Sequence, residues 1–521
     1  MTLAVNLTGL PSSDPVPGNY VEINWGVGPA AIGSNQREAL LIGNKTSSGD
    51  ATADTVIYGP ASGLPLTSES DCIARFGRGS ELHRMYRRFR AVNTSTPLYA
   101  IAVSEGSTPT AASQTITFAT TATGTGTFRI WCGDDFCEVV CASGDTVTTI
   151  ATAAAAAINA KLDWPITASS SVGVVTVTAK QGGVRGNLIR IRAQLVSGTP
   201  STTVTRGTAT ALTSGAVADD YTTALATIAA SRFYYIVSAD CADASDASAS
   251  AANFSALVSQ VTSQALPVTG IRQSVWGGHV GTVTNATTLA ALAAVNNVRV
   301  QVALMPTADV TPAEIAAHLA GAVAVLEDGD PNYNHAGLGR TNATAALWKL
   351  GAQSTQSAWL TRTQIKTCLN AGVTPIACDS RTQGSYVVKV ITTKCLTSSV
   401  ADYRVRNRQI VSTEDAYADD LVTKLALQFA NKKLGDDPAP GQSSLDANTT
   451  SPRAIKACVD QLTRDYGDLG RLRKVESDTI PNTNVGRDGS NTGRCNIRVP
   501  LYVVPPLDQT ATAIDDVSSA A

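Results

Sequence analysis

The sequence predicts a multidomain protein of mixed α/β and α+β class. With 521 residues, the chain exceeds the length at which a single hydrophobic core stops growing. From residue 220 to 328, apolar strands alternate with helices, which is typical of a parallel, doubly wound sheet. Between residues 114 and 195, strand follows strand with glycine-rich turns, which indicates a β-rich domain inserted into the α/β core.

These patterns divide the chain into six segments. The expected segments are an extended N-terminal arm (1–25), the first part of the α/β domain (26–105), the inserted β-rich domain (106–215), the α/β core (216–400), an α+β C-terminal domain (401–496) and a C-terminal strand arm (497–521).

The core elements are predicted from apolar runs and capping signals. We expect one helical region over residues 67–89 between strands at 38–44 and 97–103, and a helix over 311–328 that starts with a capping box of Thr311 and Glu314 around Pro312. The other expected core elements are strands at 233–239, 268–277 and 298–305 and helices at 253–263 and 287–295. The inserted domain is expected to contain one alanine-rich helix at 148–160.

Both ends of the chain are predicted to be arms that carry a short strand. Three prolines between Pro11 and Pro17 exclude a helix, and the alternating strand Tyr20, Val21, Ile23 follows a turn at Gly18. Near the other end, "RVPLYVVPPL" at 498–507 predicts an apolar strand closed by two prolines. Its backbone groups must be paired either within its own domain or with another chain, and the sequence leaves both options open.

The C-terminal domain is predicted to contain helices at 414–434 and 451–467. Lys432 and Lys433 lie near the end of the first helix, and Lys424 lies two turns earlier. Lysines at a helix C-terminus are favoured by the helix dipole, so an ordinary solvated helix end explains them, and docking to an acidic partner is the alternative.

Composition and charge exclude several classes of protein. The chain has 40 basic and 42 acidic residues, so a general binder of nucleic acid or anionic membrane is not expected. No apolar run is long enough for a membrane span, and the start lacks the basic and apolar regions of a signal peptide. We therefore expect a protein made in the cytoplasm, with its ten cysteines mostly buried and reduced.

Three local motifs were considered as metal or nucleotide sites. Cys132, Cys137 and Cys141 have spacings unlike those of zinc ligands and no nearby histidine, so buried hairpin thiols are expected. The loop "EDGDPNYNHAGLG" at 327–339 resembles a calcium loop but lacks the required glycine and glutamate, so a connection after a helix is expected. "WGGHVG" at 276–281 matches no nucleotide fingerprint, and a tight turn is expected there. We expect no catalytic residues, no cofactor and no metal.

Four stretches resemble the contractile tail sheath proteins of myophages, most closely the Mu-like type. They are "VPGNYVEIN" at 16–24, the inserted segment with "GDTVTTIATAAAAAINA" and "VVTVTAKQGGVRGN", the core segment from "DPNYNHAGLG" to "VVKVITT", and the C-terminal stretches "SPRAIKACVDQL" and "RCNIRVPLYVVPPLDQTATAI". Lys389 or Val390 stands where that family usually has an arginine, so no role of that arginine carries over.

This resemblance implies a structural polymer and not an enzyme. It implies six-subunit rings stacked around an inner tail tube in a virion, in contact with baseplate and tail terminator proteins, that contract to drive the tube through a cell envelope. It also implies subunits linked by exchanged strands, for which the expected residues are Tyr20, Val21, Ile23, Ile497, Val499, Leu501 and Val503. By the same resemblance the C-terminal domain faces the tube through Lys424, Lys432 and Lys433, and the inserted domain lies outside.

Two other functions are alternatives to a structural polymer. The first is a nucleotide-dependent α/β enzyme that would use the "WGGHVG" segment, and an α/β scaffold alone is no evidence for it. The second is a self-assembling surface-layer protein, against which the expected lack of an export signal argues.

Overall fold

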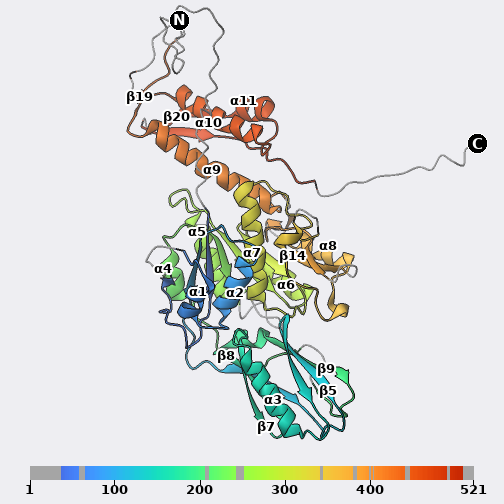
Figure 1. Cartoon of the computed structure of the whole chain (residues 1–521). Helices are drawn as coiled ribbons and strands as arrows, with labels where there is room; N and C mark the ends of the chain where they lie inside the picture. The colour runs from blue at the N-terminus through green and yellow to red at the C-terminus, as the bar shows by residue number, and fades with distance from the viewer. Residues whose placement is uncertain are drawn as a thin grey trace, which may run out of the picture.

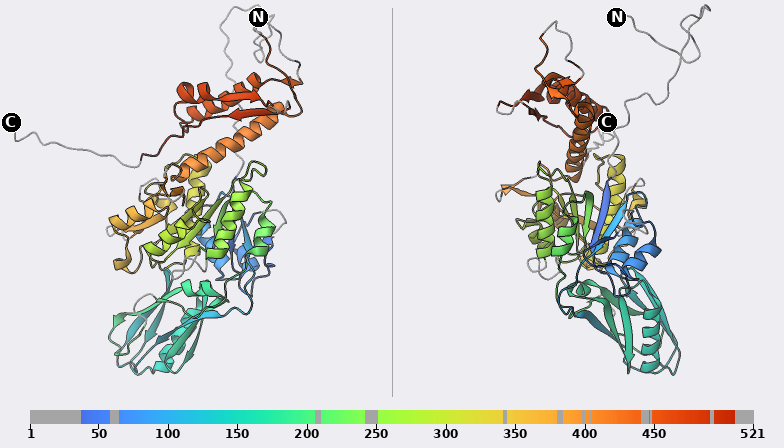
Figure 2. Two further views of the ribbon diagram at one scale, coloured as in Figure 1. Left: turned by 180° about the vertical axis from the view of Figure 1, so that it is seen from behind. Right: turned by 90° about the vertical axis from the view of Figure 1, so that its left-hand side faces the viewer.

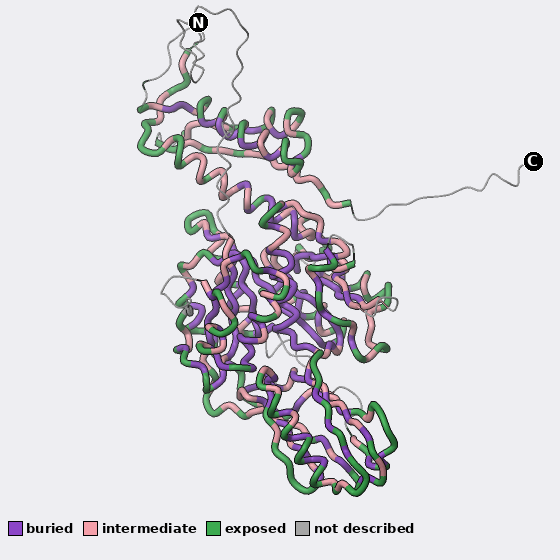
Figure 3. The backbone as a smooth tube through the Cα atoms, viewed as in Figure 1, coloured by how far each residue is buried: buried purple, intermediate pink, exposed green. Residues whose placement is uncertain are grey.

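The computed structural model describes residues 37–57, 65–205, 210–241, 251–340, 344–379, 384–397, 400–402, 404–439, 446, 448–489 and 493–507. Within these ranges the molecule has three parts that lie in a row (Figure 1): the inserted domain, the central α/β domain and a C-terminal unit. Buried backbone is concentrated in the central part, whereas the C-terminal unit is mostly intermediate or exposed (Figure 3). The chain is thus a mixed α/β protein with several sheets, as the sequence predicted.

An eight-stranded sheet forms the central domain, in the order β15-β14-β13-β12-β11-β1-β3-β2. All neighbouring strands from β14 to β3 are parallel, and the two edge strands are antiparallel. The strands are β1 (Glu38–Gly43), β2 (Val56–Ile57), β3 (Leu98–Ala102), β11 (Phe233–Ser238), β12 (Ser274–His279), β13 (Val300–Leu304), β14 (Thr374–Asp379) and β15 (Gly384–Val387).

The sheet is doubly wound, because the chain moves outward from β1 to β3 on one side and from β11 to β14 on the other. Side chains of β1 alternate between two cores: Ala39 and Leu41 face one, and Leu40 and Ile42 face the other. Figure 2 shows helices on both faces of the sheet. One face is covered by α1 (Glu69–Phe76), α2 (Glu81–Arg90) and α7 (Pro312–Gly329), and the other by α4 (Thr222–Ile228), α5 (Ala251–Gln264), α6 (Val283–Ala291) and α8 (Arg362–Asn370).

Helix α7 begins as predicted, with the capping box of Thr311 and Glu314 and with Pro312 in its first turn. The helical region predicted at 67–89 is present, and it consists of two helices, each with its own serine N-cap. The break lies at Gly77 and Gly79, whose φ angles of 81° and 78° are incompatible with a continuous helix.

The segment "WGGHVG" also differs from the prediction of a tight turn, since its first four residues belong to β12. A Cβ on Gly278 would lie 2.0 Å from the carbonyl oxygen of Pro312. Gly278 therefore lets α7 start close against the strand, and it serves packing in the core. The strand predicted at 268–277 begins six residues later than expected and ends two residues later, at Ser274–His279.

The inserted domain follows β3 and consists of a four-stranded sheet (β10-β9-β5-β6), a three-stranded sheet (β4-β8-β7) and one helix. Its elements are β4 (Ala111–Thr117), β5 (Gly126–Cys132), β6 (Asp135–Cys141), α3 (Val147–Ala160), β7 (Ile166–Ser171), β8 (Val174–Gly182), η1 (Val184–Leu188), β9 (Arg190–Gly198) and β10 (Thr210–Ala211). It meets the core through ion pairs, of which the shortest joins Arg88 of α2 to Asp134 at 2.6 Å.

The C-terminal unit, from α9 to residue 507, is built on two long helices. Its elements are α9 (Arg408–Phe429), β18 (Lys433–Leu434), β19 (Thr449–Thr450), α10 (Pro452–Asp468), η4 (Val475–Thr479), α11 (Ile480–Asn482), β20 (Asn484–Arg487) and β21 (Cys495–Arg498). The remaining short elements, η2 (Ala345–Leu347), η3 (Gln356–Ala358), β16 (Leu396–Thr397) and β17 (Val400–Ala401), lie between α7 and α9. No helix within the described ranges combines the length and the apolarity that crossing a membrane requires.

Candidate functional site at the junction of the core and the C-terminal unit

Helix α9 joins the C-terminal unit to the core. Its first turns are buried against the core, including Arg408, Ser412 and Asp415, and its second half lies outside the core. The predicted start at residue 414 missed these first turns. The junction is therefore a helix shared by two parts of the molecule.

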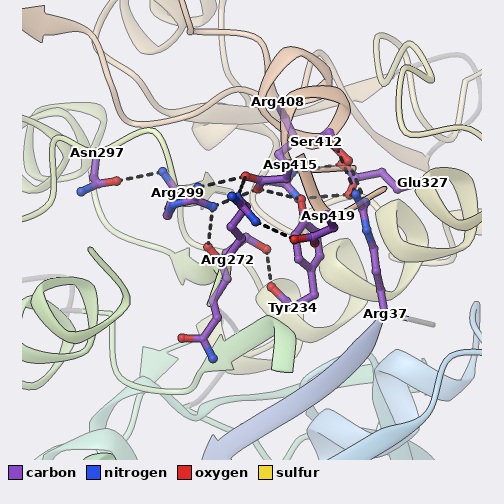
Figure 4. Close-up of polar contacts among 12 residues, drawn as sticks. Arg37, Tyr234, Arg272, Asn297, Arg299, Glu327, Arg408, Ser412, Asp415 and Asp419 are labelled. Carbon is purple, nitrogen blue, oxygen red and sulfur yellow. Dashed lines mark hydrogen bonds and ion pairs between the residues drawn. The ribbon is translucent and has the colours of Figure 1, made fainter. Parts of the chain in front are cut away.

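A buried carboxylate, Glu327 in the last turn of α7, lies at the centre of this junction (Figure 4). Arg408 donates to it through Nε and Nη2, both at 3.0 Å. Arg37, the residue before β1, donates through Nη1 at 3.2 Å, and the Tyr235 hydroxyl donates at 2.9 Å. Two arginines and a tyrosine hydroxyl donate to this carboxylate, so its charge is not left without partners in the core.

Burial and the neighbouring charges shift the pKa values of Glu327 and His335. Burial alone would raise the pKa of Glu327, but Arg408 and Arg37 outweigh it and hold the pKa below its ordinary value. Burial lowers the pKa of the neighbouring His335 to about 4, so this histidine is neutral near pH 7. Glu327 is thus ionised and paired at every pH near neutrality.

A second carboxylate, Asp415, lies about two turns after Arg408 and fixes α9 to the core sheet (Figure 4). Arg299 donates to both of its oxygens at 2.9 Å, and the Tyr234 hydroxyl donates to it at 3.2 Å. One turn further, Arg272 pairs with Asp419 at 2.6 Å. We call Glu327, Arg37, Arg408, Asp415 and Arg299 the joint, because together they hold α9 on the core.

The joint was missed by sequence reasoning. Its members come from segments that lie far apart in the chain, and a lone charged residue at a helix end is ordinarily solvated. The available signal was Arg299, directly before the predominantly apolar strand β13, and Glu327, at the end of the largely apolar α7.

In the C-terminal unit, α9 and α10 pack through Tyr417 and Tyr466, whose rings meet edge to face at 5.2 Å. The Tyr466 hydroxyl donates to Asp420 at 2.5 Å. Leu462 and Leu472 complete this small core. Because the cluster is small, extended segments that pack on it contribute much of its burial.

Four of the predicted arm residues lie in the described C-terminal segment. Ile497 is in β21 and pairs with Val485 of β20. Val499, Leu501 and Val503 are half-buried and pack on the small core. The strand predicted at 498–507 is therefore shorter and placed earlier than expected, since β21 ends at Arg498.

The physical reason is Pro500, which has no N–H group and cannot continue the ladder. Beyond it the chain stays extended and is held in its own subunit: Arg473 N–H donates to the Tyr502 carbonyl at 2.8 Å, and Val504 N–H donates to the Arg471 carbonyl at 3.0 Å. The predicted N-terminal arm residues Tyr20, Val21 and Ile23 lie outside the described residues.

The structure separates the three predicted lysines. Lys424 pairs with Asp465 of α10 at 3.1 Å, and each side chain is 21 % exposed. Lys432 and Lys433, beyond the end of α9, are exposed. Only the last two therefore present charge to a partner.

The candidate metal sites have other roles. Cys132, Cys137 and Cys141 are buried free thiols, and burial raises the pKa of Cys137 to about 11. Gly133 and Asp134 form the hairpin turn between β5 and β6, as expected. Among the residues that the structure describes, no cluster of histidine, cysteine and carboxylate side chains could hold a metal ion.

Comparison with known proteins relates the chain to one group. No protein-family profile matches the sequence. The Mu-like prophage FluMu tail sheath protein of Haemophilus influenzae is 26% identical over 235 residues, which are 45% of this chain and 47% of that protein. The match thus spans about half the length of this curated relative.

Two solved structures are similar in outline. The sheath tail protein from Listeria innocua aligns over 91% of this chain and 93% of its own, with 14% identity and a TM-score of 0.48. The sheath tail protein from Desulfitobacterium hafniense aligns over 93% of this chain and 100% of its own, with 14% identity and a TM-score of 0.45.

The Haemophilus influenzae protein is a tail sheath protein by name, in agreement with the expectation that this chain is a structural protein and not an enzyme. The chain is therefore a relative of a Mu-like prophage tail sheath protein, which confirms the resemblance predicted from its motifs.

Proposed function

We propose that this chain is the subunit of a contractile tail sheath in a virion. It polymerises as stacked hexameric rings around an inner tail tube, and the polymer contracts to drive the tube through the envelope of the target cell. Its sequence relationship to a tail sheath protein supports this role. The work of contraction comes from the free-energy difference between two packings of the same subunits, so no cofactor is needed.

One structural observation carries the linkage between subunits. Strands β20 and β21 form a sheet of two strands only, so each has an edge without a strand partner in the described part of the chain. A two-stranded sheet is marginally stable alone, and it accepts further strands through its open backbone groups. A neighbour's terminal strand, with Tyr20, Val21 and Ile23 as the N-terminal candidate, would extend this sheet.

The arrangement of the three parts supports an orientation in the polymer. The inserted domain (106–215) and the C-terminal unit lie at opposite ends of the core, so one can face outward while the other faces the tube (Figure 1). Lys432 and Lys433 are the exposed charges that would contact an acidic tube surface. Lys424 would support the C-terminal unit through its pair with Asp465.

Two truncations test the linkage. Deleting residues 1–25 leaves every described contact in place, and we expect a protein with unchanged melting temperature that forms no tubes. Because Ile497, Val499, Leu501 and Val503 contribute to the folded unit, the C-terminal truncation is placed after Leu507. Negative-stain microscopy and thermal melting measure both variants, and uniform tubes from both would contradict strand linkage.

A further inference from the structure

The segment 327–339, compared above with a calcium loop, covers the end of α7 and the loop that follows it, and its polar side chains bind protein groups. Asp328 accepts a hydrogen bond from the Thr96 hydroxyl at 2.9 Å. Asp330, Asn332 and Asn334 instead contact the C-terminal unit. Because α7 precedes this loop directly, the same end of one helix meets several distant parts of the chain.

The contacts of this loop with the C-terminal unit involve both side chains and backbone. Arg471 donates through Nε to Asp330 at 3.2 Å. Asn332 donates to the carbonyl of Val504 at 3.3 Å, and Asn334 donates to the carbonyl of Leu507 at 3.2 Å. These bonds hold the segment on both sides of the tandem prolines, before it leaves the described part of the chain.

The contact on the N-terminal side is made by Arg37. Besides its bond to Glu327, Arg37 donates to the hydroxyl of Ser412 at 2.8 Å and to its carbonyl at 3.1 Å. Its guanidinium also lies 4.0 Å from the centre of the Tyr234 ring. The residue that follows the N-terminal segment is thereby fixed both to α7 and to α9.

We propose that Glu327, Asp330, Asn332 and Asn334 form a hub that positions the roots of both terminal segments at one end of the core. The inference rests on the proposed function, since it gives the terminal arms of a sheath subunit fixed starting points. Arms that start from fixed points reach a neighbour in one direction.

Charge balance makes the hub testable. If Arg37 is removed, Arg408 still pairs with Glu327 through two hydrogen bonds, so no buried charge is left without a partner. The Arg37→Met variant should therefore fold. The variant Arg37→Lys keeps the charge near Glu327 but loses the planar fork that reaches Glu327 and Ser412 together.

A matched control exists at the other end of the same helix. Arg88 is 20% exposed against 13% for Arg37, and it pairs with the α7 glutamate Glu314, which also keeps a second arginine, Arg84. Arg88→Met thus removes one of two arginines from a buried glutamate without touching the hub. For Asn332→Ala, the control is Asn159→Ala, since Asn159 also bonds a backbone carbonyl, that of Ala168.

The experiment is hydrogen–deuterium exchange on the full-length, unassembled protein. Arg37→Met should speed exchange about tenfold in the first turns of α9, with Arg37→Lys intermediate, and Asn332→Ala should do the same at the amides of Arg473 and Val504. The two controls should leave these amides unchanged. Exchange rates within twofold of wild type, both in the first turns of α9 and at the amides of Arg473 and Val504, would contradict the proposed hub.

Assembly is then compared by negative-stain microscopy. Arg37→Met and Asn332→Ala should each give fewer and shorter tubes than wild type and the two controls. Tubes of wild-type yield and length from variants with faster exchange would overturn the positioning role. If wild-type protein forms no tubes, the proposed function fails, while the exchange data still decide whether the hub holds the two segments.

Discussion

Arg408 and Glu327 lie 81 residues apart in the chain and form two parallel hydrogen bonds of 3.0 Å, with both side chains fully buried. Arg408 begins α9, and Glu327 lies in the last turn of α7. The C-terminal unit is therefore attached to the core by an ionic contact that excludes water. Such a contact is directional, so it fixes the orientation of α9 as well as its position.

Removing this carboxylate should destabilise the protein strongly. Glu327→Ala leaves Arg37 and Arg408 buried without a counter-charge, and we expect a loss of about 3–5 kcal/mol in the free energy of unfolding. Chemical denaturation followed by circular dichroism measures this value.

The control for that substitution is Glu138→Ala. Glu138 pairs with Arg129 on the exposed face of the inserted domain, where an ion pair contributes less than about 1 kcal/mol. Equal effects of the two substitutions would contradict the role given to the joint.

Stability should fall between pH 7 and pH 5 because of buried neutral histidines. Burial lowers the pKa of His318 to about 3, whereas the unfolded chain takes up this proton near pH 6.5. The unfolded state thus binds more protons below pH 6.5, which costs the folded state about 2 kcal/mol per such histidine at pH 5.

His318→Gln tests this directly. Nε2 of His318 accepts a hydrogen bond from the Lys349 N–H at 3.0 Å, and glutamine can accept the same bond without titrating. The loss of stability between pH 7 and pH 5, measured by urea denaturation, should shrink by about 2 kcal/mol. An unchanged pH dependence would show that His318 is not the group that titrates.

The close approach of α7 to β12 should make Gly278 intolerant of a side chain. Gly278→Ala would place its Cβ 2.0 Å from the Pro312 carbonyl oxygen, so we expect a loss of about 1–3 kcal/mol in stability. Gly329→Ala at the end of the same helix is the control, since nothing lies within 4 Å of its added Cβ. Thermal melting compares them, and similar melting temperatures would argue against this packing.

Reversing the exposed charges after α9 should weaken binding to the tube. The double variant Lys432→Glu, Lys433→Glu is expected to lose at least about tenfold in co-sedimentation with tubes isolated from the same particle, and wild-type binding should weaken as salt rises. Lys366→Glu, an exposed lysine on α8, is the control. If the double variant bound tubes as well as wild type, Lys432 and Lys433 would not be part of the contact with the tube.

Local signals predicted much of the fold. Alternation of strands and helices predicted the mixed α/β class. The residues around Pro312 predicted the start of α7, because capping depends on a few adjacent side chains. Burial of the hairpin cysteines followed in the same way, from the strands that flank Gly133.

Long-range features could not be predicted. The bond between Arg408 and Glu327 exists only after the sheet has brought α7 and α9 together, and each residue alone resembles an ordinary solvated charge. The end of β21 was mispredicted for a different reason. The apolar residues after Pro500 pack on Tyr466 and Leu472 and form only an isolated bridge, between Leu472 and Val503, in place of a ladder. Such packing has the same pattern in sequence as a strand.

Negative-stain electron microscopy of the purified full-length chain tests the central claim most directly. The protein should form hollow, striated tubes of uniform width, because a sheath subunit stacks in rings of one size. A chain that stays dispersed as monomers at every concentration and salt condition, or that turns over a nucleotide, would contradict the proposal.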